Sequence, residues 1–132
     1  MLKRSKRKKI WVYISGPISI GNMILNARRA MDTFAKLMDL GYTPICPHWS
    51  VFQELVYPET VTYEYWLAYD RQLLERVDVV LRLPGESKGA DQEVEWAKEL
   101  GIPVFEDLDT LKEWASNWLG DEIAHARHLR SR

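Results

Sequence analysis

The sequence lacks several features that would place it in a special class of protein. Its single cysteine, Cys46, leaves no internal disulfide framework and no second thiol for a zinc cluster. No apolar run approaches the roughly 18 residues that a membrane helix needs, and the chain has no internal repeat. We therefore expect a cytoplasmic protein without a membrane segment, a resident metal or a cofactor.

Basic residues are scarce outside the first nine positions. The segment MLKRSKRKK (1–9) holds 6 of the 18 lysines and arginines, so the rest of the chain has 12 basic and 19 acidic residues. We expect this leader to be disordered, and it runs into WVYIS, which is unlike a cleavable signal. It could contact nucleic acid. In the expected tail, 121–132, His125 and His128 lack the third ligand that a metal site needs.

The remaining chain is long enough for one domain, predicted over 10–120, in which apolar strand patterns alternate with helical ones. The predicted strands are 10–15, 43–46, 78–83 and 103–106. The predicted helices are 22–40, 61–76, 89–100 and 108–119. The aromatic segment 47–60 is expected to be a long loop over one end of the sheet.

This order of elements predicts an α/β fold, a parallel sheet with helices on both faces. Right-handed crossovers favour a flavodoxin-like (Rossmann-like) sheet of four to five strands in the order 2-1-3-4. Ligands bind such sheets where the strand order reverses, which places the loops SGPI (15–18) and PGESKG (84–89) side by side. Their N–H groups could hold a phosphate, although glycine and serine also occur in such loops for turn geometry alone.

Two carboxylates lie on the apolar faces of predicted helices. Glu93 falls inside the apolar arc of helix 89–100, where it could favour the helix dipole or serve a site. Asp70 lies at the centre of the apolar face of helix 61–76 and should be hydrogen-bonded or border a cavity, because burying an unpaired carboxylate is costly. If the topology holds, the two could approach each other beside the third strand.

Three further polar residues have expected places. Asn26 faces inward on the first helix and could tie down the SGPI loop, and Tyr13 could either orient Glu93 or be a core aromatic. Asp78 begins the third strand at the opposite end of the sheet, so we assign it to structure. Two carboxylates beside a phosphate-type loop suit chemistry at a sugar carbon, in which one attacks C1′ and the other handles protons.

Four pieces of the sequence, in this order, resemble the nucleoside 2-deoxyribosyltransferase superfamily. They are YISGPI (13–18), Asn26, Asp70 eight residues before Asp78, and the S-x-G-A-x-x-E pattern from Ser87 to Glu93. The small phage and bacterial members and the nucleoside 5′-monophosphate N-glycosidases are the most similar. The likeness spans about residues 11 to 105.

The resemblance implies roles for the matching residues. Glu93 would be the nucleophile that takes the (deoxy)ribosyl group, Asp70 the acid that assists, and Tyr13 the residue that holds the nucleophile. The substrate-binding positions that it implies are Ser15, Gly16, Pro17, Ile18, Asn26, Ser87, Gly89 and Ala90. Serine at 87 favours a nucleotide, because the aspartate that nucleoside transferases tend to carry there would repel a phosphate.

The base and the subunit arrangement are less well matched. His48, Trp49 and Phe52 lie where a base should be sandwiched, although they match no motif of the family. Family members complete the pocket with a residue of a neighbouring subunit, for which Asn117 is the candidate, so we expect a homodimer or homotetramer. Three tryptophans near outer helix faces also favour a subunit contact: Trp96, Trp114 and Trp118.

The leading interpretation is an enzyme that cleaves the N-glycosidic bond of a (deoxy)nucleoside 5′-monophosphate and passes the sugar, through an ester on Glu93, to water or another base. One alternative is a lysine-decarboxylase-like phosphoribohydrolase, whose PGGxGTxxE loop is partly imitated by PGESKGADQE (84–93) with different spacing. Others are a nucleotide-binding sensor without turnover and a purely structural protein. The sequence does not decide between hydrolase and transferase.

Overall fold

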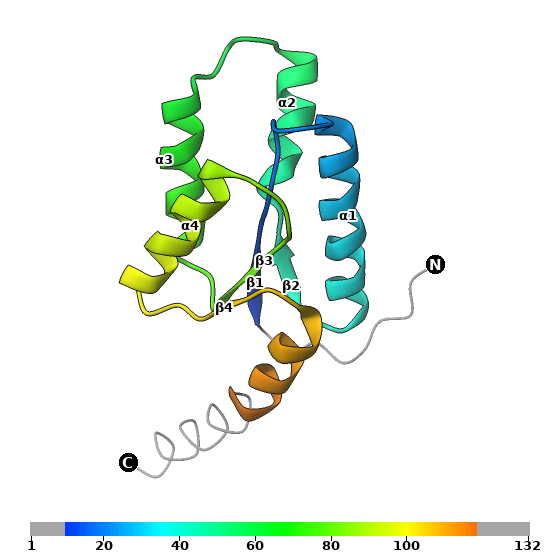
Figure 1. Ribbon diagram of the computed structural model, residues 1–132, viewed down its shortest axis with the longest axis vertical. Helices are drawn as coiled ribbons and strands as arrows, with labels where there is room; N and C mark the ends of the chain where they lie inside the picture. Colours follow the sequence, from blue (N-terminus) through cyan, green and yellow to red (C-terminus); the bar gives the residue numbers. More distant parts are fainter. Residues whose placement is uncertain (1–9, 119–132) are drawn as a thin grey trace.

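The computed structural model describes residues 10–118, which form a parallel sheet between two layers of helices (Figure 1). The strands are β1 (Trp11–Ser15), β2 (Thr43–Ile45), β3 (Val79–Arg82) and β4 (Val104–Phe105). Their order is β2-β1-β3-β4 and every pairing is parallel, so the predicted flavodoxin-like order is confirmed. The predicted leader 1–9 and tail 121–132 lie outside the described residues.

Side-chain caps begin the three long helices. These are α1 (Met23–Asp39), α3 (Tyr63–Leu74) and α4 (Lys88–Glu99), and their caps are Asn22, Thr62 and Ser87. Residues 108–118 are helical too, and position 119 of that predicted helix lies outside the described residues. Within 10–118, no helix has the length and apolar character needed to cross a membrane.

The segment 47–60 is not the continuous loop that its sequence predicts. It contains the 3-10 helix η1 (Pro47–Trp49) and the α-helix α2 (Ser50–Val56). Proline suits the first position of a helical turn, and α2 is anchored by Val51, which is buried. The prediction was wrong because the exposed aromatic residues hide this short helical pattern.

Two apolar clusters fill the space on the two faces of the sheet. Val12 and Ile14 of β1 pack with α1 and with residues 108–118, whereas Tyr13 packs with α3 and α4. Side chains alternate along a strand, so Ser15 lies on the same face as Tyr13. The predicted covering of both faces is confirmed, and two polar side chains of β1 project toward α4.

The three tryptophans proposed for a subunit contact have partners within the chain. Trp114 and Trp118 stack with ring centroids 5.6 Å apart and pack against the core. The guanidinium of Arg71 lies over the ring of Trp96, 5.2 Å from its centroid. The homo-oligomer stays a prediction.

The two ends of the sheet are built differently. At the amino ends of the strands, Asp78 Oδ2 accepts a hydrogen bond of 2.8 Å from Trp11 N, which is the structural place expected for this residue. At the carboxyl ends, the two glycine-containing loops pack against each other. A Cβ added at Gly85 would lie 2.8 Å from Cγ of Pro17, closer than side-chain carbons approach.

The tight contact between the loops predicts a cost for substitution at Gly85. Gly85 has φ +118, so Gly85→Ala adds backbone strain to the clash and should lower the free energy of unfolding by about 2 to 4 kcal/mol. The control is Gly21→Ala, at φ +83 in open space, which should cost about 1 to 2 kcal/mol. Urea unfolding of both variants measures the difference, and equal losses would contradict the packing of the loops.

Candidate active site

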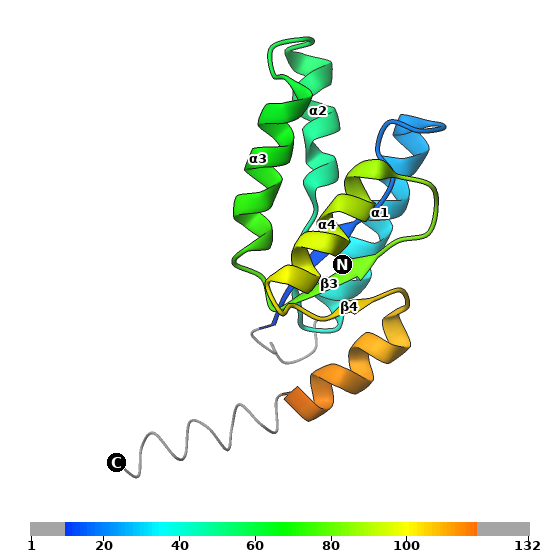
Figure 2. The same ribbon diagram turned by 60° about the vertical axis from the view of Figure 1, so that its left-hand side comes forward.

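A cavity of about 780 Å³ opens at the carboxyl ends of β1 and β3. Both views show α2 and α3 rising beyond this end of the sheet (Figure 1, Figure 2). The wall includes Gly16 and Ile18 of the SGPI loop, Trp66 and Asp70 of α3, and Glu93 of α4. This is the point where the strand order reverses, at which α/β sheets bind ligands.

Glu93 is buried in this wall, and β1 holds both of its carboxylate oxygens. The side chain is 7% exposed. The Tyr13 hydroxyl donates a short hydrogen bond to Oε2, and Ser15 Oγ donates to Oε1 over 3.0 Å. Because Tyr13 and Ser15 are two positions apart on one strand, they approach the carboxylate from the same side. The orientation of Glu93 is therefore fixed by the strand.

Burial raises the pKa of Glu93 to about 7, although the hydrogen bonds from Tyr13 and Ser15 and the charge of Arg82 act to lower it. Burial, and then the charge of Glu93, raise the pKa of Asp70 to about 7 as well. Two carboxyl groups that titrate in the same range can supply one protonated and one ionised group near neutral pH. General acid and nucleophilic steps need this combination.

The first turn of α4 forms another part of the wall, through Ser87, Lys88, Gly89 and Ala90. Ser87 is buried, and its Oγ accepts the N–H of Ala90 over 3.1 Å. The N–H of Ala90 is therefore occupied by the cap, whereas those of Lys88 and Gly89 belong to the first helical turn, where N–H groups have no partner within the helix. This helix start favours an anion.

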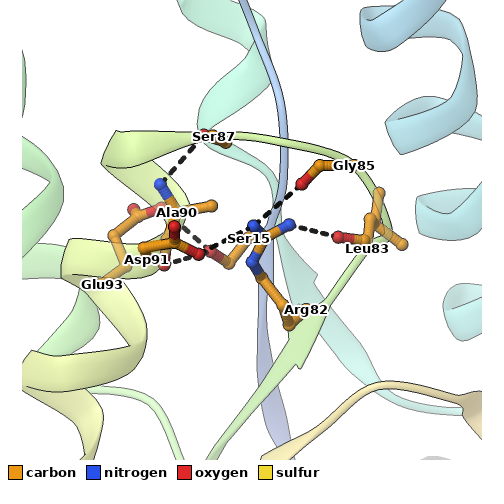
Figure 3. A network of polar contacts seen from close by, with 8 residues as sticks. All are labelled: Ser15, Arg82, Leu83, Gly85, Ser87, Ala90, Asp91 and Glu93. Atoms are coloured by element: carbon orange, nitrogen blue, oxygen red, sulfur yellow. Dashed lines mark hydrogen bonds and ion pairs between the residues drawn. The ribbon is translucent and has the colours of Figure 1, made fainter.

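Arg82, which was not among the site residues predicted from the sequence, supports the loop before α4 (Figure 3). Its guanidinium binds the carbonyl oxygens of Leu83 and Gly85 and lies 3.0 Å from Oδ1 of Asp91. The pairing of β1 with β3 sets Arg82 beside Ser15, so it reaches the same face of the sheet as Glu93. An arginine at the end of a buried strand was the available signal.

Asn26 supports the SGPI loop from α1. Its Nδ2 donates to the carbonyl oxygens of Ile18, over 3.1 Å, and Ile20, over 2.8 Å. The structural role considered for Asn26 agrees with these contacts. Ile18 and Gly16 then lie on the cavity wall, whereas Pro17 packs toward the other loop.

His48 lies behind the SGPI loop and not on the wall of this cavity. It is 2% exposed, its Nε2 lies 2.9 Å from the carbonyl oxygen of Pro17, and its Nδ1 lies 3.6 Å from Sγ of Cys46. Burial lowers the pKa of His48, so the neutral ring donates to Pro17. Trp49 is 43% exposed and also lies off the wall. Beyond the sheet, side chains of α2 and α3 line the cavity instead.

Asn117 does not meet the cavity within one chain. It is exposed on the helical residues 108–118, which follow β4 and lie at the end of the molecule opposite α2 and α3 in both views (Figure 1, Figure 2). Its predicted contribution therefore depends on a neighbouring subunit.

The raised pKa of Glu93 predicts how this side chain affects stability as the pH changes. An acid with a higher pKa in the folded chain binds more protons when folded, so its contribution to stability is lost as the pH rises from about 4.5 to about 7. Glutamine does not titrate, so the unfolding free energy of Glu93→Gln minus that of wild type should rise by up to about 3 kcal/mol as the pH rises over this range. Urea unfolding at several pH values measures it. Glu95→Gln, exposed on the same helix, is the control, and the same pH dependence in both variants would contradict the burial of Glu93.

Comparisons with known proteins agree with this fold. A solved 2-deoxyribosyltransferase from the psychrotolerant bacterium Bacillus psychrosaccharolyticus, described as a biocatalyst for the synthesis of antiviral and antitumoral nucleosides, is 19% identical and matches with a TM-score of 0.52. The match covers 71% of this chain and 69% of that one, and at this identity it shows a shared fold. A family model described as a domain of unknown function (DUF4406) matches residues 10–106. The chain therefore belongs to the DUF4406 family and has the α/β fold of a 2-deoxyribosyltransferase.

Proposed function

We propose that the protein cleaves the N-glycosidic bond of a (deoxy)nucleoside 5′-monophosphate and transfers the sugar, through an ester on Glu93, to water or a second base. The observation that carries this proposal is the buried Glu93, with Tyr13 and Ser15 on its two oxygens, in a cavity that Asp70 also lines. The named activity of the structurally similar protein, deoxyribosyl transfer, points the same way.

In the first step, a carboxylate oxygen of Glu93 bonds to C1′ as the bond between C1′ and the base nitrogen breaks. The electron pair of the broken bond goes to the base, which takes up a proton. Asp70 can supply this proton, because its raised pKa of about 7 leaves it partly protonated near neutral pH. The hydrogen bonds from Tyr13 and Ser15 hold the attacking group in one orientation and favour its ionised form.

In the second step, the acceptor attacks C1′ and the ester bond to Glu93 breaks. The carboxylate of Asp70 can take the proton that a water molecule or an acceptor base loses. Glu93 then leaves as a carboxylate, which Tyr13 and Ser15 again receive. Tyr13 and Ser15 therefore hold Glu93 in both steps. Asp70 donates a proton in the first step and accepts one in the second.

The start of α4 suits the 5′-phosphate of the substrate. Ser87 and Gly89 line the cavity beside Glu93, and the helix start carries a partial positive charge. Arg82 supports this loop through the carbonyl oxygens of Leu83 and Gly85, and its ion pair with Asp91 offsets part of its charge. A phosphate at the helix start would leave C1′ of the same nucleotide within reach of Glu93.

The catalytic proposal predicts the behaviour of two substitutions. Glu93→Gln keeps the shape of the side chain but removes the nucleophile, so base release from 5′-monophosphates should fall by at least about a thousandfold. Asp70→Asn should lower it by about a hundredfold to ten-thousandfold, because proton transfer is lost. Liquid chromatography of the free base, with and without an acceptor base, measures both.

Glu95→Gln is the matched control, since Glu95 is exposed on the same helix and should leave the rate unchanged. Covalent capture of a 2′-fluoro sugar analogue at Glu93 would support the ester directly. Full turnover by Glu93→Gln would refute the ester on Glu93. Nucleotide binding by wild type without release of base from any nucleoside or monophosphate would refute the enzyme and favour a sensor.

The phosphate site proposed at the start of α4 predicts a change of substrate preference on substitution of Ser87. Ser87→Asp keeps a good helix cap but adds a negative charge, so kcat/KM for monophosphates should fall by at least about tenfold while nucleosides are little affected. Ser87→Asn is the control, because asparagine is a neutral helix cap of the same size as aspartate. Equal losses in the two variants would show that size at position 87, and not charge, controls the preference.

A further inference from the structure

We propose that Glu54 of α2 selects the base, and that the preferred base is guanine. The inference rests on the proposed function and deepens it, because it names the part of the nucleotide that the outer cavity recognises. Glu54 belongs to the segment 47–60, whose helix was not expected from the sequence. Its side chain lines the same cavity as Glu93 and Ser87.

The carboxylate of Glu54 is fixed in place and is not a freely moving surface group. Its Oε1 accepts the indole N–H of Trp66 over 3.1 Å, and its Oε2 accepts the backbone N–H of Glu59 over 3.3 Å. Trp66 is itself held edge to face between Tyr65 and Tyr69, with ring centroids 6.4 Å and 5.6 Å away. A group on the cavity wall that is held this way can discriminate between ligands, because it cannot adapt to each of them.

Different elements of the cavity wall carry different charges. The start of α4, with Lys88 beside it, forms the part that suits the phosphate. The carboxylates of Glu54 and Glu59 belong to α2 and the turn after it, which rise beyond the start of α4 in both views (Figure 1, Figure 2). Apolar side chains of Val51 and Leu67 also line the wall and suit the faces of a base. A nucleotide with its phosphate at α4 would therefore present its base to Glu54.

Guanine is the base whose edge matches an ionised carboxylate. A carboxylate has about four acceptor sites and no donor, and the contacts to Trp66 and Glu59 use two of them. Guanine offers adjacent N1–H and N2–H donors, which the two oxygens can accept together. Adenine places an acceptor, N1, beside its donor, and hypoxanthine lacks the 2-amino group. Both should bind more weakly. One carboxylate oxygen of Glu54 would face the N1 lone pair of adenine, and with hypoxanthine one oxygen would have no donor.

The test measures binding to the Glu93→Gln protein, which cannot turn the ligand over. Calorimetric titration with dGMP, dIMP and dAMP should show dGMP bound at least about tenfold more tightly than the other two. Adding Glu54→Gln replaces one acceptor by a donor but can still accept from Trp66, so it should reduce the dGMP preference to about threefold or less. Glu64→Gln, exposed on α3, is the control and should keep the preference.

The outcomes separate this inference from the proposed function. Equal binding of the three nucleotides, tighter binding of dAMP, or a dGMP preference that survives Glu54→Gln would overturn the role of Glu54 and leave the glycosidase proposal standing. Failure of all three nucleotides to bind would overturn the guanine inference, and the base-release assay on nucleosides and monophosphates would then decide the proposed function separately. A dGMP preference that Glu54→Gln removes and Glu64→Gln retains would support the selection of guanine by Glu54.

Discussion

The burial of the Glu93 carboxylate is the constraint on which the rest of the site depends. A carboxylate that is 7% exposed is tolerated only if its oxygens find donors, and both donors come from β1. This requires Tyr13 and Ser15 on the face of the strand that looks toward α4. It also requires α4 to start at a fixed height above the sheet, which the Ser87 cap and the Arg82 contacts determine.

The loops around Glu93 are held by side chains that bind their backbone carbonyl groups. Asn26 binds the carbonyl groups of Ile18 and of Ile20, just beyond the SGPI loop, and His48 binds that of Pro17. Arg82 does the same for the loop before α4. Because these supports bind backbone carbonyls, they fix the path of each loop and leave the cavity side of the loop for a ligand.

Periodicity revealed the residues whose position depends on local structure. Glu93 and Asp70 stood out because a carboxylate interrupts an apolar helix face, and the order of strands and helices gave the sheet. Long-range contacts decided the rest. Nothing in the sequence near Arg82 or His48 indicates which carbonyl each will bind, since the partner is placed by the register of the strands or by a distant loop. The exposed aromatic residues around α2 likewise obscured a helix that carries part of the cavity wall.

The cavity thus has a floor and a wall with different origins. The floor, around Glu93, is built from the central strands and α4, so a change there disturbs the core and the loops together. The outer wall comes from α2 and α3, which rise beyond the sheet and make fewer contacts with it (Figure 2). A substitution such as one at Glu54 alters a hydrogen bond on this wall without touching β1. Such a change leaves Glu93, Tyr13 and Ser15 in place, whereas α3 carries both Asp70 and Trp66, the hydrogen-bond partner of Glu54, and so links the outer wall to the floor.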